Sequence, residues 1–430
     1  MKSISFVTLG CKVNQYDTAV LINKLPKSKY TTVPFPGKAD IYVIDTCTVT
    51  HKADAEARQY INRAKRINPN GVVVVTGCYA QVSAEEISNL KGVDYVVGNS
   101  DKFTSLMKIL RQGSLQKEPK VFINDIFKEK KRKFESPEIE FFPGRTRAFL
   151  KVQDGCNYAC TFCIIPYARG RSRSLGIDDV IKRIRVLRQS GYKETVLTGI
   201  HLASYGRDIG SNLIELLSRI EDEKILSRIR LSSLDPADIN QEFINFVSNS
   251  QTICPSFHIS LQSGDEQVLK NMRRRYKPKQ FLDITYQIRQ AMPDSSIGTD
   301  IMVGFPGETE VEFNNSYNLL DESELTYFHV FPYSKRKGTK AAIMDNQIDP
   351  GVIKQRSKII RDLGMKKKIE FNKKFVGKEL EVLVENNSKG TSRNYISVKL
   401  HKDDYSKGEL IDVVISDLED DMVIATKYIH

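Results

Sequence analysis

Three cysteines lie close together in the segment 155–163, which reads GCNYACTFC. Thiols at this spacing cannot all pair with one another as disulfides, but thiolates this close can hold a compact soft metal centre, and iron–sulfur clusters are bound by short runs of this kind. A four-iron cluster held by three thiolates leaves one iron open, like the open position at a catalytic zinc ion. A structural zinc site or three buried thiols are the alternatives, but zinc sites normally pair two short cysteine spacings. The segment therefore predicts a reactive iron–sulfur site at Cys156, Cys160 and Cys163.

Three further cysteines follow predicted strands in the first part of the chain. Cys11, Cys47 and Cys78 each stand two or three residues past the end of a strand. The carboxyl ends of parallel strands meet at one edge of an open sheet, where such sheets bind ligands. These thiols therefore predict a second three-thiolate cluster, with buried packing as the alternative. Cys254 has no partner motif, and we expect it to be a plain buried cysteine.

The elements that carry this second set of cysteines alternate between strands and helices. The β-branched run at 72–76 is typical of a strand buried on both faces of a parallel sheet. Asn14 is placed to cap the first helix, and Ser83 with Glu86 predicts a capping box. The pattern indicates a doubly wound, parallel α/β domain. We predict strands at 3–8, 41–45, 72–76 and 95–97, and helices at 15–25, 52–67, 84–90 and 101–110.

The cysteine run at 155–163 follows the first of six predicted strands in the middle of the chain. Helix-period segments separate these strands, which indicates a partial (β/α)6 barrel of the TIM type, open on one side, with its site at the carboxyl ends of the strands. The cysteine loop lies at that edge. We predict strands at 148–152, 195–198, 228–232, 256–261, 296–302 and 326–331, and helices at 178–189, 212–220, 239–248 and 279–291.

Several strand ends of this barrel pass into glycine or a small polar residue, which lets a ligand approach the backbone closely. Taken singly, they are also ordinary turns between a strand and a helix. His201, His258 and His329 lie in or beside strands, and we interpret them as structural or rim residues rather than ligands. The candidates for cofactor contacts are Thr198, Gly199, Ser232, Gln262 and Gly304, with Arg169 from the basic run after the cysteines.

Composition changes mark the other parts of the chain. Residues 113–142 are typical of a linker, with one strand at 121–123 and a charged run at 128–133 to which we assign no role. We predict a domain at 1–112 that carries the first three cysteines, a linker at 113–142, a central barrel domain at 143–372 and a small β domain at 373–430.

The net charge of +12 favours a polyanionic partner, nucleic acid first, although a lysine-rich surface can also be merely solvated. Residues 351–378 hold ten basic against two acidic side chains.

Short strands predicted at 379–384, 395–400, 410–416 and 422–426 suggest a small antiparallel barrel, a fold that often binds oligonucleotides. Two basic groups are candidates for phosphate contacts. They are Arg273, Arg274 and Arg275, and Lys366, Lys367 and Lys368.

The CxxxCxxC spacing of the middle cysteines resembles the radical S-adenosylmethionine superfamily. The pair of three-cysteine sites resembles the methylthiotransferase family within it, over essentially the whole chain. The segment LGCKVNQ at 9–15 looks like the branch that acts on N6-threonylcarbamoyladenosine at tRNA position 37, whereas other branches tend to carry GCQMN or GCPKN there. The tail resembles the TRAM domain. The superfamily's Gly-Gly-Glu after the second strand is absent, and Thr198 and Gly199 stand in its place.

This resemblance implies two 4Fe–4S clusters, one on each set of three cysteines, and S-adenosylmethionine as the cofactor. Reductive cleavage of the cofactor at the open iron would give a radical that removes hydrogen from C2 of the base, and sulfur would enter through the auxiliary cluster on Cys11, Cys47 and Cys78. The partners it implies are the anticodon stem-loop of tRNA, an electron donor such as flavodoxin or ferredoxin, and a sulfur source.

Alternatives remain at the level of the substrate and of the class. Within the family, isopentenyladenosine in tRNA or a small-subunit ribosomal protein could be the acceptor. Outside it, the alternative is a non-catalytic iron–sulfur protein that binds RNA or senses redox state, although such a protein gains nothing from an open iron.

No run of about 18 apolar residues occurs, so we expect no membrane span. The seven clustered cysteines favour a reducing cytoplasm.

Overall fold

The computed structural model describes residues 1–100, 102–112, 120–127, 134, 136–386, 388–400 and 405–427. The chain forms two compact units. The first contains Met1–Phe141, Asp154–Arg173 and Ser334–Ala342, and the second contains Phe142–Gln153, Ser174–Tyr333 and Ile343–His430. The charged run predicted at 128–133 lies outside the described residues.

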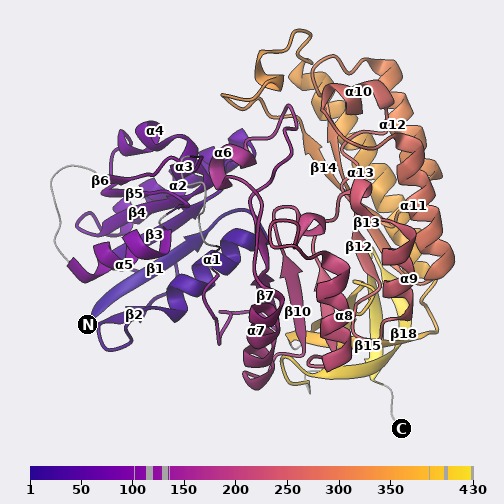
Figure 1. The fold of residues 1–430 in the computed structure, drawn as a ribbon, viewed down its shortest axis with the longest axis horizontal. Coiled ribbons are helices and arrows are strands. Elements are labelled where there is room, and N and C mark those ends of the chain that lie inside the picture. Colours follow the sequence, from indigo (N-terminus) through magenta and orange to yellow (C-terminus); the bar gives the residue numbers. More distant parts are fainter. Residues whose placement is uncertain are drawn as a thin grey trace. The chain divides into compact units, whose positions relative to one another are not determined.

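A parallel sheet of six strands forms the centre of the first unit, in the order β2-β1-β3-β4-β5-β6 (Figure 1). The strand order reverses between β1 and β3, the kind of position at which open α/β sheets bind ligands. The strand predicted at 121–123 is β6, which pairs with β5 and extends this sheet. The strands are β1 (Lys2–Thr8), β2 (Tyr30–Thr32), β3 (Ile41–Thr46), β4 (Val72–Gly77), β5 (Tyr95–Val97) and β6 (Lys120–Phe122).

Helices cover both faces of this sheet, which confirms the predicted doubly wound fold. On one face, Ala57 and Ile61 of α2 pack in a buried cluster with Tyr42 and Ile44 of β3. Val43 alternates with them and is also fully buried, because α1 packs on β3 from the opposite face. The helices are α1 (Lys12–Asn23), α2 (His51–Ile67), α3 (Cys78–Val82), α4 (Ala84–Ser88), α5 (Lys102–Gln112) and α6 (Ile165–Arg169).

Both predicted helix caps are wrong. Asn14 lies inside the first turn of α1, and its side chain donates to the carbonyl oxygens of Leu9 (2.9 Å) and Thr46 (3.0 Å). It therefore ties α1 to the ends of two strands instead of capping the helix. Ser83 makes no side-chain bond at the start of α4, and Glu86 accepts a hydrogen bond from a tyrosine hydroxyl instead.

Six parallel strands form a partial barrel in the second unit, as predicted. β7, β10 and β11 pair side by side, and so do β12, β13 and β14. Parallel bridges at Ile229–Ile253 and Leu234–Ile259 join the two groups, so the strands follow one another in sequence order. The strands are β7 (Arg147–Lys151), β10 (Glu194–Thr198), β11 (Arg228–Leu231), β12 (Ser256–His258), β13 (Ser296–Val303) and β14 (Tyr327–Pro332), with the short strands β8 (Gln153–Asp154) and β9 (Arg173–Ser174). The helices are α7 (Ile177–Gln189), α8 (Leu213–Glu223), α9 (Gln241–Asn249), α10 (Glu266–Asn271), α11 (Pro278–Ala291) and α12 (Glu310–Glu322).

A long basic helix, α13 (Pro350–Lys373), leads into a closed barrel of five strands in the order β15-β16-β17-β19-β18. The predicted small barrel is confirmed, with two differences. β16 has no counterpart among the predicted strands, and β17 pairs with β19 in parallel rather than antiparallel. The strands are β15 (Glu379–Asn386), β16 (Lys389–Ser392), β17 (Ser397–Leu400), β18 (Leu410–Glu419) and β19 (Met422–Lys427).

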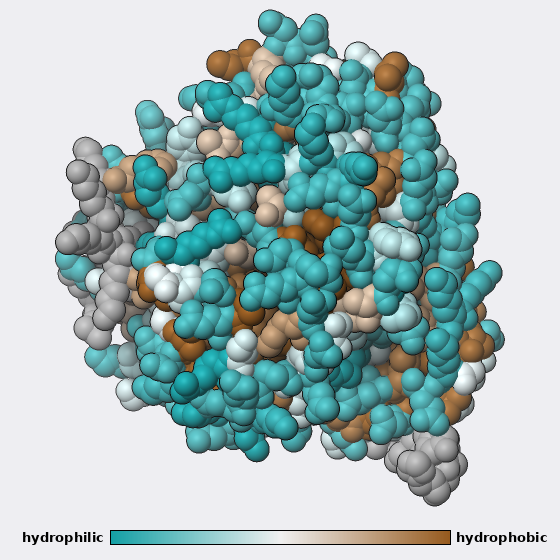
Figure 2. Space-filling view, turned by 45° about the vertical axis from the view of Figure 1, so that its right-hand side comes forward, coloured by the Kyte–Doolittle hydropathy of each residue, from teal (hydrophilic) through white to brown (hydrophobic). Residues whose placement is uncertain are grey.

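The surface in Figure 2 is covered mainly by hydrophilic side chains, and the hydrophobic ones gather in small separate groups. Among the described residues, every helix is too short or too polar to cross a bilayer.

Candidate functional site

Cys11, Cys47 and Cys78 lie together at the carboxyl edge of the sheet in the first unit. Cys11 stands at the start of α1, Cys47 directly follows β3, and Cys78 begins α3 directly after β4. Gly10 (φ +91°) permits this close approach, because a Cβ atom there would lie 2.9 Å from the Cys47 sulfur. Cys78 is buried, whereas Cys11 is exposed. The strand order thus gathers three thiols that are far apart in the sequence.

The environment of these thiols affects when they can act as ligands. Burial raises the pKa of the Cys47 thiol to about 12, and the sulfur of Cys78 adds to the effect. Burial also raises the pKa of Cys78, while the positive charge of Arg169 opposes that rise. Ligation requires the thiolate form, so such thiols ionise when a metal centre binds them. Three soft sulfur donors with one exposed member fit an iron–sulfur cluster that is open on one side.

The second set of cysteines belongs to the same unit. Cys156, Cys160 and Cys163 are each half-buried, in a loop that folds back on itself. The Cys156 amide donates to the carbonyl oxygen of Gly170 (3.0 Å). At Gly155 (φ +74°) a Cβ atom would lie 2.1 Å from a backbone oxygen, so only glycine fits this turn. The three thiol donors of this loop also fit a cluster with one open iron.

Arg169, at the end of α6, links the loop of the second cysteine set to α1, the helix that Cys11 precedes. It is 2% exposed, and its guanidinium donates to Asp154 (3.1 Å) and to the side-chain oxygen of Asn14, with Asp17 at 3.6 Å. Burial disfavours its charge, but the sulfur of Cys78 and the carboxylates hold the pKa of Arg169 well above its usual range. A permanent positive charge therefore lies beside the auxiliary thiols.

A buried lysine extends this network beneath the sheet edge. Lys102 is 2% exposed and pairs with Asp17 (3.3 Å) and Asp45 (3.0 Å). Burial raises the pKa of Asp45, although Lys102 opposes the shift. The sequence gives no sign of this network, because buried charges leave no periodic signal and their partners are distant in sequence.

Arg336 supplies a second buried guanidinium to the first unit. It donates to the hydroxyl of Thr48 (2.6 Å), the residue directly after Cys47, and to the carboxylate of Asp54 (2.5 Å). In the same segment, the Ala341 amide donates to the carbonyl oxygen of Thr161, between two ligand candidates of the other loop (2.9 Å). Residues 334–342 therefore contact both cysteine-bearing regions. No local pattern in the sequence indicates this role of Arg336.

In the second unit, the end of β10 shows features of a ligand cradle. Thr198 is buried, and a Cβ atom at Gly199 would lie 2.6 Å from the side-chain oxygen of Gln153. That oxygen accepts a hydrogen bond from the His201 amide (2.8 Å). The buried hydroxyl of Ser232, after β11, has no hydrogen-bond partner among the described residues. An orphaned hydroxyl beside a glycine turn fits the polar groups of S-adenosylmethionine.

The other two strand-end candidates have special backbone conformations. Gln262 adopts φ +68°, and its backbone bridges to β13 through the carbonyl oxygen of Asp300 (2.8 Å). Gly304 (φ +77°) donates its amide to the buried carboxylate of Glu308 (2.9 Å). Its amide is thus already used within the protein.

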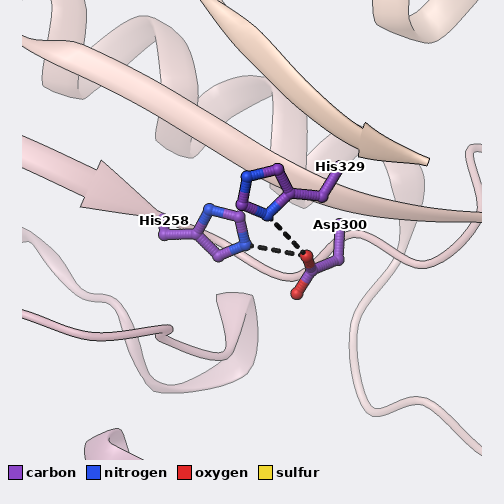
Figure 3. A group of neighbouring side chains, drawn as sticks. All are labelled: His258, Asp300 and His329. Atoms are coloured by element: carbon purple, nitrogen blue, oxygen red, sulfur yellow. Dashed lines mark ion pairs between the residues drawn. The ribbon is translucent and has the colours of Figure 1, made fainter. Parts of the chain in front are cut away.

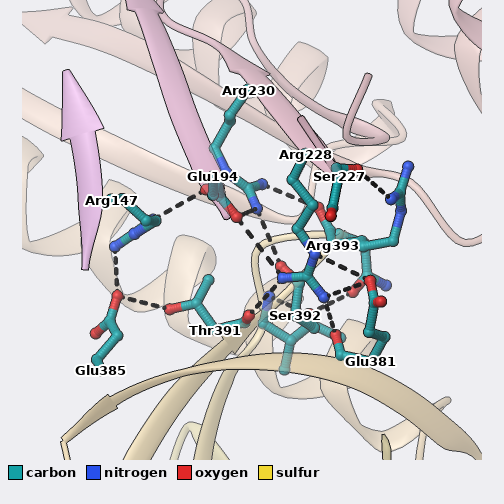
Figure 4. A network of polar contacts seen from close by, with 12 residues as sticks. Arg147, Glu194, Ser227, Arg228, Arg230, Glu381, Glu385, Thr391, Ser392 and Arg393 are labelled. Carbon is teal, nitrogen blue, oxygen red and sulfur yellow. Dashed lines mark hydrogen bonds and ion pairs between the residues drawn. The ribbon is translucent and has the colours of Figure 1, made fainter. Parts of the chain in front are cut away.

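A network of arginines and glutamates fills the amino end of the partial barrel (Figure 4). Glu194 is completely buried and pairs with Arg230 (2.8 Å), with Arg228 at 3.6 Å. Burial disfavours its charge, but Arg230 holds the pKa of Glu194 below its usual range. Arg228 also pairs with Glu381 of β15 (2.7 Å), and Arg147 pairs with a second glutamate of that strand (2.6 Å). The network therefore joins the partial barrel to the C-terminal barrel within one unit.

The predicted arginine group divides by exposure. Arg273 and Arg275 are exposed on the turn after α10. Arg274 is nearly buried, where it pairs with Asp235 (2.5 Å) and lies over the ring of Tyr276. Exposure leaves Arg273 and Arg275 accessible to a phosphate group, whereas Arg274 supports the fold.

The predicted lysine group on α13 divides in the same way. Lys366 is exposed. Lys367 donates to the carbonyl oxygen of Ser323 (2.7 Å), and Lys368 pairs with Asp421 of the C-terminal barrel. Burial lowers the pKa of Lys367. Two of the three lysines thus have partners within the protein.

Two family models match this chain. Residues 3–98 match the uncharacterized protein family UPF0004, and residues 150–320 match the radical SAM superfamily. Among solved structures, the radical S-adenosylmethionine methyltransferase TsrM from Kitasatospora setae, with cobalamin and a 4Fe–4S cluster bound, has a TM-score of 0.58 at 13% identity and covers 80% of this chain and 77% of its own. This likeness shows the fold.

Full-length relatives identify the family. A threonylcarbamoyladenosine tRNA methylthiotransferase MtaB from Aquifex aeolicus is 43% identical over 96% of this chain and 100% of its own. The protein of the same name from Bacillus subtilis is 41% identical over 95% and 90%. A tRNA-2-methylthio-N(6)-dimethylallyladenosine synthase from Moorella thermoacetica is 32% identical over 90% and 88%. This chain belongs to the radical SAM methylthiotransferase family, in its MtaB-like branch.

Proposed function

We propose that this chain converts N6-threonylcarbamoyladenosine at position 37 of tRNA to its 2-methylthio derivative. The observation that carries the proposal is the presence of two three-thiol sites in one folded unit. Cys11, Cys47 and Cys78 follow strands β1, β3 and β4, and the other three cysteines lie in the loop 155–163. The names of relatives that are 36–43% identical support the substrate.

The thiols divide between two cofactors. Cys156, Cys160 and Cys163 would hold the 4Fe–4S cluster that binds S-adenosylmethionine, and the other three cysteines would hold the auxiliary 4Fe–4S cluster. When bound, these groups supply one-electron reduction and radical chemistry at an unactivated C–H bond, together with sulfur, which acid–base side chains cannot supply.

The protein's own groups position these cofactors. The turn at Gly155 aims the cysteine loop, and Arg169 ties that loop to α1 while it compensates negative charge on the auxiliary thiolates. We assign Arg169 to this positioning role rather than to direct cofactor contact, because its guanidinium is buried and bound to other side chains. The hydroxyl of Ser232 and the cradle at Gly199 remain our candidates for contacts to S-adenosylmethionine, with Thr198, Gln262 and Gly304 beside them.

Binding of tRNA would involve the basic surface of the second unit. We propose phosphate contacts through Arg273, Arg275 and Lys366, which are exposed, and an anticodon stem-loop whose target base leaves the stack to reach the barrel.

The division into domains 1–112, 143–372 and 373–430 with a linker between the first two stays part of this proposal. The proposal also includes an electron donor such as flavodoxin or ferredoxin, a sulfur source and a cytoplasmic location.

A reconstitution assay tests the proposal. The full chain is loaded anaerobically with iron and sulfide, and it should hold about eight irons, the content of two cubane clusters. With a reductant and S-adenosylmethionine, it should add a methylthio group to anticodon stem-loop RNA that carries threonylcarbamoyladenosine, as read by nucleoside mass spectrometry. A preference for RNA that carries isopentenyladenosine, or for a ribosomal protein, would reassign the substrate. About four irons without product would leave a non-catalytic iron–sulfur protein.

A further inference from the structure

Two histidines share one carboxylate on the inner face of the partial barrel (Figure 3). The carboxylate is Asp300 of β13, which lies in register with His329 of β14. One oxygen of Asp300 is 2.9 Å from Nε2 of His258, on β12, and 3.5 Å from Nδ1 of His329. The other oxygen accepts a hydrogen bond from the Ser260 hydroxyl (3.2 Å). Three neighbouring strands therefore direct their polar side chains at one point.

The two histidines differ in what they can still bind. His258 uses its second ring nitrogen on the hydroxyl of Tyr327 (3.3 Å), and its side chain is 12% exposed. His329 turns Nδ1 toward Asp300 and its side chain is 56% exposed, and its Nε2 has no hydrogen-bond partner among the described residues. Burial disfavours the charge of Asp300, but the two imidazoles hold its pKa well below the usual range. Asp300 therefore stays ionised and fixes the orientation of His329.

Aromatic rings surround the exposed imidazole. Tyr327, His329 and Phe331 alternate along β14 and so share one face, and Phe331 is 41% exposed with its ring centre 6.5 Å from that of His329. Tyr395, 38% exposed, lies 6.3 Å from the ring of Tyr327. Arg230 and Arg147 lie over the ring of Tyr395, at 5.0 and 5.6 Å from its centre, so the exposed ring of Phe331 is the better placed to stack with an unpaired RNA base.

The arginines deeper in the barrel are less suited to bind an anionic ligand. Arg228 and Arg230 are buried and paired with Glu194, and Arg147 with a glutamate of β15 (Figure 4). His329, by contrast, is an exposed polar group beside Tyr327 and Phe331. An imidazole with one nitrogen held by a carboxylate presents the other to a ligand, and in its protonated form it donates a charge-assisted hydrogen bond to a carboxylate.

We propose that His329, oriented by Asp300, determines substrate specificity by binding the terminal carboxylate of the N6 substituent. This inference rests on the proposed function, because a threonylcarbamoyl group ends in a carboxylate whereas an isopentenyl group offers only hydrocarbon. A site built to bind a charged group discriminates strongly against an analogue that lacks it. His329 thus selects the anionic substituent, and the exposed ring of Phe331 is placed to stack with the base.

The experiment compares two RNA substrates on the reconstituted full chain. One anticodon stem-loop carries threonylcarbamoyladenosine, and the other carries the same nucleoside with its carboxylate converted to a primary amide. For the unaltered chain, KM should be about tenfold lower for the carboxylate RNA, as expected for one charge-assisted hydrogen bond. His329→Phe keeps a ring but removes both nitrogens. It should raise KM for the carboxylate RNA about tenfold, leave KM for the amide RNA unchanged, and leave kcat within about twofold.

Controls separate binding from folding and from the wider proposal. His329→Asn, which keeps an N–H donor, should recover part of the discrimination, and Tyr286→Phe on the exposed outer surface of α11 should behave like the unaltered chain. Equal KM values for both RNAs on the unaltered chain would overturn the inference even if His329→Phe failed to fold. Loss of S-adenosylmethionine cleavage in His329→Phe would also overturn it, by placing the residue in the cofactor site. If the unaltered chain modifies only isopentenyladenosine RNA, the proposed function itself fails.

Discussion

At the residue scale, the chemistry depends on thiols whose surroundings differ between the two sites. Cys78 is buried and Cys47 nearly so, while a permanently charged arginine lies beside them. The three cysteines of the loop 155–163 are each half-buried, and this loop relies on a glycine turn for its shape. We therefore expect changes at the two sites to have separable effects.

Replacement of Cys47 by alanine tests this separation. Cys47→Ala removes one proposed ligand of the auxiliary cluster and leaves the loop 155–163 intact, so S-adenosylmethionine cleavage should continue while methylthio product disappears. The iron content should fall from about eight toward four per chain. Product analysis by mass spectrometry, together with measurement of 5′-deoxyadenosine, checks both halves. Intact methylthiolation would show that the first three cysteines serve only in packing. Cys254→Ala, at a buried cysteine outside both sites, is the matched control.

Arg169 offers a test of charge compensation. The test variant carries Arg169→Gln together with Cys156→Ala, so that one cluster is observed. In this variant, the reduction potential of the auxiliary cluster should shift to more negative values. The reason is that a neighbouring positive charge favours the more negative, reduced cluster. Redox titration followed by electron paramagnetic resonance measures the shift. Arg171→Gln, at an exposed side chain nearby, should leave the potential unchanged. An unaltered potential in the Arg169 variant, with normal iron content, would remove this role.

At the element scale, strand order explains how the auxiliary site forms. Residues that follow β1, β3 and β4 meet because these strands are adjacent and parallel, and the apolar runs of the sequence are sufficient to predict this. β16 escapes prediction because its sequence KGTS lacks an apolar pattern. The pairing of Arg336 with Asp54 spans 282 residues and has no local signal. Asp300 and its two histidines also lack a local signal. The alternation of side chains along each strand places them in strands, but it does not reveal that they contact one another.

The buried network around Glu194 predicts a pH-dependent contribution to stability. Because the folded state lowers the pKa of Glu194, its contribution is fully present above the ordinary value of 4.5 and is lost as pH falls through the lower folded value. Glu194→Gln should destabilise the protein by about 3–5 kcal/mol at pH 7, since it leaves buried arginines without their partner. The difference from the unaltered chain should shrink below about pH 4.5.

Urea unfolding followed by circular dichroism, at pH 7 and pH 4, measures this effect. Asp362→Asn is the control, because Asp362 pairs with Lys358 on the exposed surface of α13, where such a pair contributes about 0.5 kcal/mol or less. A difference between Glu194→Gln and the unaltered chain that stays constant with pH would contradict the assignment.

At the scale of the whole molecule, the proposed function requires the chain to hold a large polyanion while one base reaches the barrel. The double variant Arg273→Ala, Arg275→Ala should weaken binding of the anticodon stem-loop and reduce the slope of log affinity against log salt by roughly two. Arg219→Ala, at an exposed arginine that pairs with Glu223 on α8, is the control. Fluorescence anisotropy over a range of salt concentrations measures both. An unchanged slope would place the RNA on another surface.

The central claim concerns the product in the cell, and nucleoside mass spectrometry of total tRNA tests it most directly. In cells that lack this gene, 2-methylthio-N6-threonylcarbamoyladenosine should disappear while unmodified N6-threonylcarbamoyladenosine accumulates. Expression of the unaltered chain should restore the methylthio form, and expression of Cys156→Ala should not. Persistence of the methylthio form in the deleted cells would contradict the account.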